Sequence, residues 1–312
     1  MAGVADKFKT GSAARPRVAC EVRPEGVIAG RASHDKRKAD TVLAYAPLAA
    51  RALTPGLKTP NVADRTALVS ALETALSATN ARDRDLTIVV PDAAARVLLL
   101  DFDTLPAKRQ EAISVVRFRL RKMVPFDVDT AAVSYQVMGQ KANQLSVLVT
   151  VMPADVLAEY EGVAREAGYQ PGAVLPATLA VAAGLDGGGA TLLVNQMRSS
   201  VTTAVTSGDE MLLHRTVDLS ADLPPGSPAR DEEIAQAVIT ALAWYEDTLR
   251  ATPAKLHYAG PGGAQAARLS RWLRLVDAAP AIADVAVPTG ATMATDVPAG
   301  ITAGVTGALA SQ

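Results

Sequence analysis

Each half of the chain opens with the same local pattern, and this repetition limits the possible folds more than any other feature of the sequence. Residues 17–28 predict two short strands joined by a tight turn at 24–26. Residues 191–196 and 201–206 predict a second pair of strands, and a turn at 207–210 leads into a third strand. Helices and further strands follow each hairpin. We therefore predict a duplicated α/β architecture with a cleft between the two halves.

A compact block of alternating strands and helices lies between the two hairpins. Residues 86–167 predict the order strand, strand, helix, strand, strand, helix, and we interpret them as a subdomain. The first helix of the block is predicted at 108–123, where Ile113, Val116 and Leu120 share one side and basic residues occupy the others.

Charge and cysteine content exclude several classes of function. The 31 basic and 32 acidic residues give a net charge of −1, so the chain has no global basic field for nucleic acid. Cys20 is the single cysteine, which fits a reducing compartment, and we interpret it as a small buried hydrophobe rather than a reactive thiol. The sequence contains no secretory signal and no run of about 18 apolar residues. We expect a soluble protein that meets a membrane only through partners or a surface helix.

Motifs for enzymatic chemistry are missing from the sequence. His34, His214 and His257 have no second ligand at metal spacing, so we predict surface or structural roles for them. No G-x-S-x-G motif or Walker loop occurs. The glycines at 186–189 follow a helix and precede a strand, which is the wrong order for a phosphate loop. The turn at 260–263 has the better context, since such a turn can hold an anion or a nucleobase, although it can equally serve strand-to-helix packing.

The central region carries an unusual combination of motifs. A predicted strand ends in Pro-Asp at 91–92, the amphipathic helix ends in Val-Pro-Phe at 124–126, and Tyr-Gln-Val-Met-Gly follows at 135–139. These segments resemble the middle of the PilM family of type IV pilus assembly proteins. The similarity covers about residues 17–310 and is strongest at 86–184.

The resemblance implies the fold of actin and of the cell-division protein FtsA. That fold is an actin-like (ribonuclease H-like) α/β fold, with two lobes around a nucleotide cleft and a small α+β insert in the first lobe. The expected domains are a disordered tail at 1–16, a first-lobe core at 17–85, an insert of the FtsA 1C type at 86–167, and a second lobe at 168–312.

The resemblance also locates a degenerate nucleotide site. Actin-like folds carry, in each of two hairpins, an Asp that positions Mg²⁺ and, two residues later, a Gly that lets the backbone reach the phosphates. Here Glu21 and Arg23 stand at these positions in the first hairpin, and Asn195 and Met197 stand in the second. We therefore predict no enzymatic activity and no bound metal, and ATP with Mg²⁺ is disfavoured as a cofactor, although Arg23 could itself hold a phosphate. The adenosine-side glycines expected in the same site are Gly260, Gly262 and Gly263.

With enzymatic activity disfavoured, the resemblance implies that the protein functions by binding partner proteins. It implies a cytoplasmic scaffold, peripheral to the inner membrane, that binds the N-terminal tail of a bitopic PilN-like protein and couples the alignment complex to the motor. Pilus motor ATPases are further expected partners, and no nucleic acid is expected. The partner groove is expected at the insert and the first lobe, with Phe118, Met123, Val124 and Phe126 as candidate anchors; ordinary packing is the competing interpretation for each.

Two other functions stay open at this point. The chain could be an active actin-like ATPase with a divergent site, which the two hairpins disfavour. It could also be a scaffold of type II secretion resembling the cytoplasmic part of GspL. GspL continues into a transmembrane helix, and we find no such segment in this sequence. The basic residues of the amphipathic helix could face acidic partners, lipid headgroups or only solvent; they are Arg117, Arg119, Arg121 and Lys122.

Overall fold

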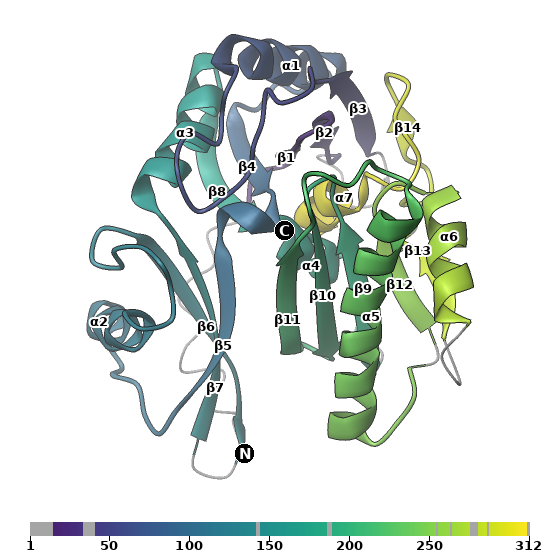
Figure 1. Ribbon diagram of the computed structural model, residues 1–312. Helices are drawn as coiled ribbons and strands as arrows, with labels where there is room; N and C mark the ends of the chain where they lie inside the picture. The colour runs from purple at the N-terminus through teal and green to yellow at the C-terminus, as the bar shows by residue number, and fades with distance from the viewer. Residues whose placement is uncertain are drawn as a thin grey trace.

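The computed structural model of the chain describes residues 15–33, 41–141, 144–185, 189–253, 255–262, 264–274, 280–285 and 287–310. Nearly all of the expected disordered tail at 1–16 lies outside the described residues. Three β-sheets and the helices around them build the molecule (Figure 1). Among the described residues, every helix is too short or too polar to cross a bilayer.

The first lobe is built on a six-stranded sheet with the strand order β14-β3-β2-β1-β4-β8. Strands β1 to β3 form an antiparallel meander, and β4 and β8 continue the sheet parallel to β1. This confirms the hairpin predicted at 17–28. The strands are β1 (Val18–Arg23), β2 (Gly26–Arg31), β3 (Val42–Pro47), β4 (Asp85–Val90), β8 (Gln170–Pro176) and β14 (Thr292–Met293).

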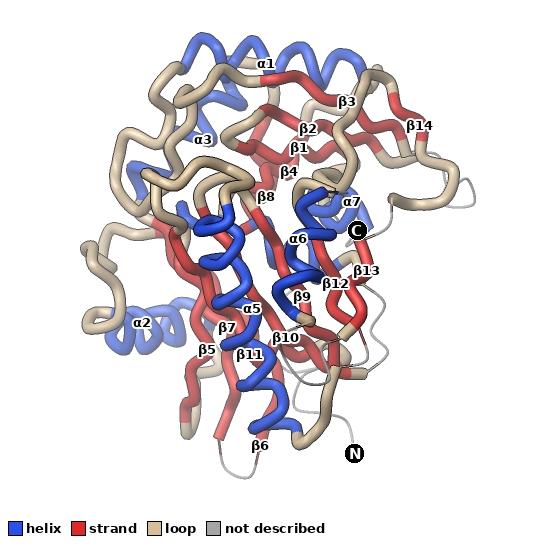
Figure 2. Tube along the Cα trace, turned by 45° about the vertical axis from the view of Figure 1, so that its right-hand side comes forward, coloured by secondary structure: helices blue, strands red, loops and turns tan. Residues whose placement is uncertain are grey.

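Helices cover both faces of this sheet. On one face, α1 (Arg65–Ala78) and α3 (Ala154–Glu166) pack on the strands and on each other. Asp64 begins α1 by accepting a hydrogen bond from the Ala67 amide at 2.9 Å, as an N-cap does. On the other face lie α4 (Ala177–Ala183) and α7 (Ala303–Ala310), which pack on each other between this sheet and the second lobe (Figure 1). Figure 2 shows α7 below the strands of the first-lobe sheet.

The second lobe repeats the plan of the first. Its five-stranded sheet has the order β11-β10-β9-β12-β13, in which an antiparallel meander is again followed by two parallel strands. The duplicated architecture predicted from the sequence is therefore confirmed. Two helices, α5 (Pro228–Leu249) and α6 (Ala264–Leu273), pack against one face of this sheet. The strands are β9 (Ala190–Gln196), β10 (Ser200–Ser207), β11 (Glu210–Asp218), β12 (Lys255–Ala259) and β13 (Ala281–Asp284).

The insert is a three-stranded antiparallel sheet with one helix. Its strands β5 (Arg96–Phe102), β7 (Gln144–Met152) and β6 (Ala132–Lys141) lie in that order, and α2 (Arg109–Leu120) packs on one face. A short 3₁₀ helix at Asp92–Ala94 connects it to the first lobe.

The insert is narrower than the predicted block of 86–167. Strand β4 belongs to the first-lobe sheet because it pairs with both β1 and β8, and α3 packs on that sheet rather than on the insert. Parts of the predicted second lobe also join the first lobe, since β8 and β14 extend its sheet and α7 packs against β1 and β2. The helix predicted at 108–123 ends at Leu120, three residues earlier than expected.

Candidate functional site

The first cleft hairpin carries a buried ion-pair cluster in place of an open phosphate site. Side chains alternate along β1, so Cys20 and Val22 enter the core under α1 while Glu21 and Arg23 lie on the opposite face of the sheet. The Arg23 guanidinium donates from Nη1 to Glu21 Oε1 at 2.7 Å and from Nε to Glu25 Oε1 at 2.8 Å. Both Glu21 and Arg23 are fully buried.

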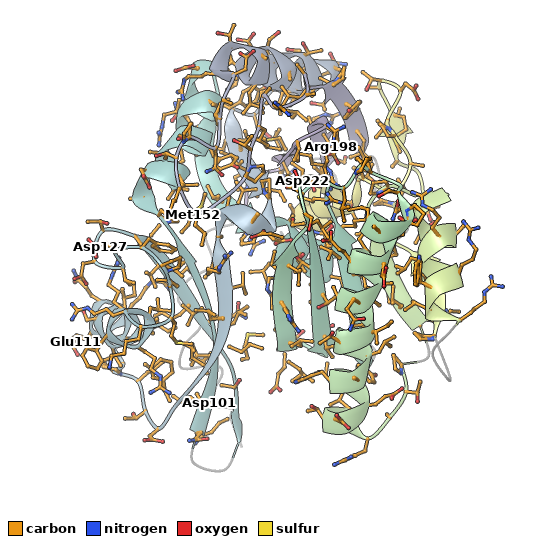
Figure 3. All side chains as sticks on the ribbon, viewed as in Figure 1. Asp101, Glu111, Asp127, Met152, Arg198 and Asp222 are labelled. Atoms are coloured by element: carbon orange, nitrogen blue, oxygen red, sulfur yellow. The ribbon has the colours of Figure 1, made fainter. Side chains whose placement is uncertain are left out.

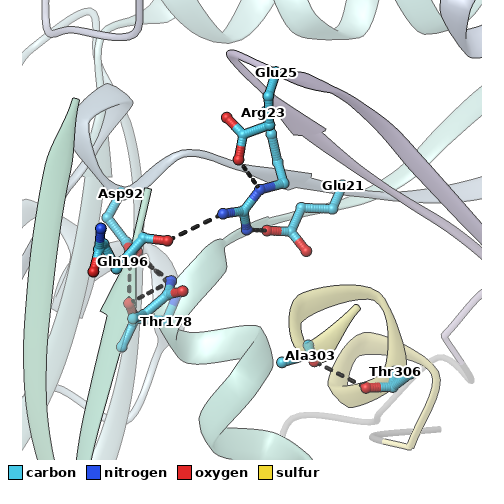
Figure 4. Close-up of polar contacts among 9 residues, drawn as sticks. Glu21, Arg23, Glu25, Asp92, Thr178, Gln196, Ala303 and Thr306 are labelled. Atoms are coloured by element: carbon cyan, nitrogen blue, oxygen red, sulfur yellow. Dashed lines mark hydrogen bonds and ion pairs between the residues drawn. The ribbon is translucent and has the colours of Figure 1, made fainter. Parts of the chain in front are cut away.

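The same guanidinium reaches across the cleft. Arg23 Nη2 donates to the backbone oxygen of Gln196, at the end of β9, at 3.1 Å (Figure 4). One side chain therefore joins the two hairpins that, in a nucleotide-binding relative, would face each other across phosphates. Arg23, at the position where the resemblance leads one to expect a Gly, thus places its own positive charge between the two hairpins.

Burial controls the protonation of this cluster. Burial raises the pKa of Glu21, and the charge and hydrogen bond of Arg23 oppose that rise without cancelling it. For Arg23, burial works to lower the pKa, but the carboxylates of Glu21 and Glu25 together outweigh it, so the guanidinium stays charged. Glu21 Oε2 has no hydrogen-bond partner among the described residues. It lies against Gly304 of α7, where an added Cβ would come within 2.3 Å of this oxygen.

The second cleft hairpin carries a hydrogen-bonded network around one carboxylate instead. Asn195 donates from Nδ2 to Asp92 Oδ2 at 3.2 Å and to Thr178 Oγ1 at 3.0 Å. Asp92 in turn accepts from the backbone and the hydroxyl of Thr178. All three side chains are buried. The amide that replaces the expected Asp is therefore held inside the protein by partners from two other segments.

Asp92 and Thr178 were not assigned to the site from the sequence. The Pro-Asp end of β4 was recognised as a motif, and a carboxylate directly after a buried strand is a usable signal for a buried polar network. Thr178 carries no such signal, because it lies in an Ala-rich helix, 86 positions from Asp92 along the chain.

Met197 and the glycine turn complete the cleft. Met197 extends from the second lobe into an apolar cluster on the first-lobe sheet and α7, which includes Ala19, Ile28 and Val305. The backbone amide of Gly260 donates to Gly300 O at 2.9 Å, and that of Gly262 donates to Ala299 O at 3.2 Å. The amides of this turn are thus engaged by the chain itself. Gly263 lies outside the described residues.

A cleft of about 660 Å³ remains beside the glycine turn. Its walls include Glu25, Met197, Arg198, Gly262 and Ala299. Two of the three arginines that line it from the second lobe have side-chain partners: Arg268 pairs with Asp231 at 2.8 Å, and Arg230 donates to the backbone oxygens of Ser220 and Arg198. The third is Arg198 itself. Among the described residues, no group of three or more His, Cys, Asp and Glu side chains could hold a metal ion.

A second recess lies where the insert meets the first lobe. It has a volume of about 140 Å³. We call it the insert groove; Val90, Leu157, Val174 and Pro176 line it from the first lobe, and Ala95, Ala132, Val133, Ser134, Thr150 and Met152 line it from the linker and the insert. Met152, labelled in Figure 3, marks this junction.

The insert groove lies beside two sheet edges. Strand β8 is the last strand of the first-lobe sheet, and β6 is the last strand of the insert sheet. Residues of both strands line the groove. An edge strand presents backbone groups that can pair with an extended peptide. The groove thus combines apolar walls with neighbouring hydrogen-bonding edges.

The four anchors predicted from the sequence do not line the insert groove. Alternation along β7 separates the two sides: Val147, Val149 and Val151 face α2, whereas Thr150 and Met152 face the groove. Phe118 and Met123 are 73% and 45% exposed on the α2 side. Val124 and Phe126 are half-buried against the insert core there. As partner contacts, these four residues remain a prediction.

Comparison with known proteins shows the fold. No protein-family model matches the chain, and no curated protein matches it. Among solved structures, it is similar to a chain of a PilM–PilN type IV pilus biogenesis complex, with a TM-score of 0.74 at 15% identity over 95% of this chain and 100% of that chain. The actin-like two-lobed fold predicted from the sequence is therefore confirmed.

More distant structures were also found. The cytoplasmic domain of EpsL, an inner-membrane component of the type II secretion system of Vibrio cholerae, matches with a TM-score of 0.48 at 11% identity, over 83% of this chain and 95% of that chain. A Bacteroides thetaiotaomicron protein with an actin-like ATPase fold matches with a TM-score of 0.47 at 8% identity, over 94% of both chains.

Proposed function

We propose that this protein is a PilM-like, non-enzymatic scaffold of a type IV pilus or related secretion machine. It binds the N-terminal cytoplasmic tail of a bitopic PilN-like partner and acts at the cytoplasmic face of the inner membrane. The observation that carries this proposal is the likeness, over nearly the whole chain, to a component of a PilM–PilN complex. Pilus motor ATPases are further partners in this proposal.

The insert groove supports the proposal because it fits a short extended peptide. Apolar walls from β4, β8 and α3 on one side and from β6 and β7 on the other suit one or two aliphatic side chains. The edges of β6 and β8 offer backbone hydrogen bonds that do not depend on the peptide sequence. Affinity would come from the backbone pairing, and selectivity from the apolar walls.

The side chains at the phosphate-facing positions of the cleft support a scaffold that does not hydrolyse ATP. Hydrolysis in this fold needs a metal-positioning carboxylate and backbone close to the phosphates. Here Glu21 is engaged by Arg23, Asn195 is engaged by Asp92 and Thr178, and Met197 is buried. We propose that partner binding proceeds without nucleotide.

Binding of a labelled N-terminal peptide of the PilN-like partner, followed by fluorescence anisotropy, tests the groove. Val174→Asp places an unpaired carboxylate among the apolar walls, on the first-lobe side of the groove, and is expected to weaken binding about 100-fold. Val115→Asp is the matched control, because it makes the same change on α2, away from the groove, and should bind the peptide like the unchanged protein.

A second groove variant separates blocking from unfolding. Ala132→Phe fills the groove without adding charge and is also expected to abolish binding, and thermal melts of both variants verify that they remain folded. Peptide affinity unchanged in folded Val174→Asp and Ala132→Phe proteins would contradict the proposed site.

A further inference from the structure

We propose that the outward face of α2 binds directly to an anionic lipid surface. This lipid-facing patch consists of Val115, Phe118, Arg119, Lys122 and Met123. It is separate from the insert groove and from the cleft, so it does not rest on the proposed function.

Apolar exposure concentrates at this helix. Five large hydrophobic side chains are exposed among the described residues, and three of them belong to the patch: Phe118 at 73%, Met123 at 45% and Val115 at 39%. An exposed Phe is costly in water but favourable at a membrane interface, where its ring leaves water for the headgroup and acyl boundary.

The helix divides its residues cleanly between two faces. Ala112, Val116 and Leu120 recur every four positions and are buried against the insert sheet. Val115 and Phe118, three positions apart on the helix, are exposed on the side away from that stripe, and Lys122 is exposed in the turn that follows the helix. The apolar exposure therefore does not arise from loose packing, because the helix already has a complete inner face.

Positive charge surrounds the exposed Phe. Between Lys108 and Asp129 there are six basic and three acidic residues, in a chain whose net charge is −1. Several of these charges have partners: Lys108 pairs with Glu111, Arg121 pairs with Asp129, and Arg117 donates to loop carbonyls. Arg119 and Lys122 have no ion-pair partner among the described residues. Arg119 follows Phe118 on the helix, and Lys122 lies in the turn after the helix.

The position and shape of the patch favour a membrane over a peptide. Figure 3 places Glu111 and Asp127, which bracket the patch along the chain, on the outer side of the insert, away from the second lobe. A single projecting helix side presents a convex surface, whereas a peptide is held by a groove or a sheet edge. Basic side chains around an exposed aromatic complement an anionic headgroup layer, and each basic residue near such a surface adds measurably to binding.

Sedimentation of the full chain with vesicles tests this proposal. The probes are vesicles of phosphatidylcholine alone and of phosphatidylcholine mixed equally with phosphatidylglycerol. We expect binding to the anionic vesicles that weakens as salt is added. Arg119→Ser with Lys122→Ser is expected to lower the partition coefficient about 30-fold. Phe118→Ser, which removes the apolar contact but no charge, is expected to lower it about tenfold.

A matched control separates a local patch from overall charge. Arg51→Ser with Lys58→Ser removes the same charge from exposed positions of the first lobe and should leave vesicle binding unchanged. Peptide binding of the patch variants should also be unchanged, which keeps this test distinct from that of the proposed function.

Three outcomes would overturn the proposal. The first is equal binding of the unchanged protein to neutral and anionic vesicles. The second is a loss of vesicle binding in the Arg51→Ser, Lys58→Ser control as large as that in the Arg119→Ser, Lys122→Ser variant. The third is a dimer in solution that Phe118→Ser dissociates without any vesicle binding by the unchanged protein, because the patch would then join two copies of the chain.

Discussion

The interlobe cleft and the insert groove divide polar and apolar side chains in opposite ways. In the cleft, charged and amide side chains are buried and engaged with one another, and the Arg23 guanidinium joins both lobes. In the insert groove, apolar side chains line an open recess beside two sheet edges. In a nucleotide-dependent member of this fold, we would expect the cleft to supply unpaired groups. Here the groups at those cleft positions are engaged within the chain, and we propose that the groove binds the partner instead.

Removing the guanidinium should produce the largest effect on stability. Arg23→Ala leaves the buried Glu21 carboxylate without its partner and is expected to cost about 3–5 kcal/mol in the free energy of unfolding, measured by urea denaturation. The matched control is Arg65→Ala, whose ion pair with Glu166 is exposed, so water replaces the lost contact and little change is expected. If both variants lost the same small free energy of unfolding, the Arg23 cluster would not hold the two lobes together.

Restoring the carboxylate expected in the second hairpin should be the next largest effect. Asn195→Asp places a second carboxylate beside Asp92, whose Oδ2 atom is 3.2 Å from Asn195 Nδ2, and should destabilise the protein by about 2 kcal/mol at neutral pH. Repulsion between the two groups raises the pKa of the pair in the folded state. The variant should therefore regain stability as the pH falls and lose it as the pH rises through that raised pKa.

Unfolding of this variant at several pH values, with and without Mg²⁺, checks the prediction. The unchanged protein measured in parallel is the control. A variant that is as stable as the unchanged protein at high pH without Mg²⁺ would indicate that the cleft is open to solvent at this position.

The smallest effect concerns His214 on β11. Burial lowers the pKa of this imidazole, and the nearby Asp92 carboxylate opposes the shift only in part. A lowered folded-state pKa means that the unfolded chain binds the proton more readily. The contribution of His214 is thus complete above its ordinary pKa of 6.5 and is lost as the pH falls through the lowered value.

His214→Gln should therefore reduce the acid sensitivity of the melting temperature, measured between about pH 5 and about pH 8. The unchanged protein, measured in parallel, serves as the control. Identical slopes for the His214 variant and the unchanged protein would assign the acid sensitivity to other groups.

The sequence predicted many of the strands and helices, because these elements depend on residues that are close together along the chain. Alternation and turn residues located the hairpins of both lobes, and the amphipathic pattern at 108–123 located α2. The insert boundary was misplaced because β4 and β5 are consecutive apolar runs, and only pairing with β1 and β8 assigns β4 to the first lobe.

The site was harder to predict because its contacts are long-range. The resemblance to the PilM family indicated the cleft residues by their places in the two hairpins: Glu21, Arg23, Asn195 and Met197. The partner of Arg23 on the second lobe is a backbone oxygen 173 positions away, which no side-chain pattern reveals. The insert groove depends on which face of β7 meets α2, which the sequence does not show. The sequence shows the apolar character of Phe118 but not its exposure, and its role as a partner anchor stays a prediction.

Titration of the full chain with a labelled tail peptide of the PilN-like partner, with and without Mg-ATP, tests the central claim most directly. If the chain's own side chains occupy the phosphate-facing positions of the cleft and the groove binds the partner, the binding curve is saturable and the same Kd is obtained in both conditions. Binding that requires Mg-ATP, or that strengthens at least about tenfold with it, would contradict the account, because the cleft would then control the groove.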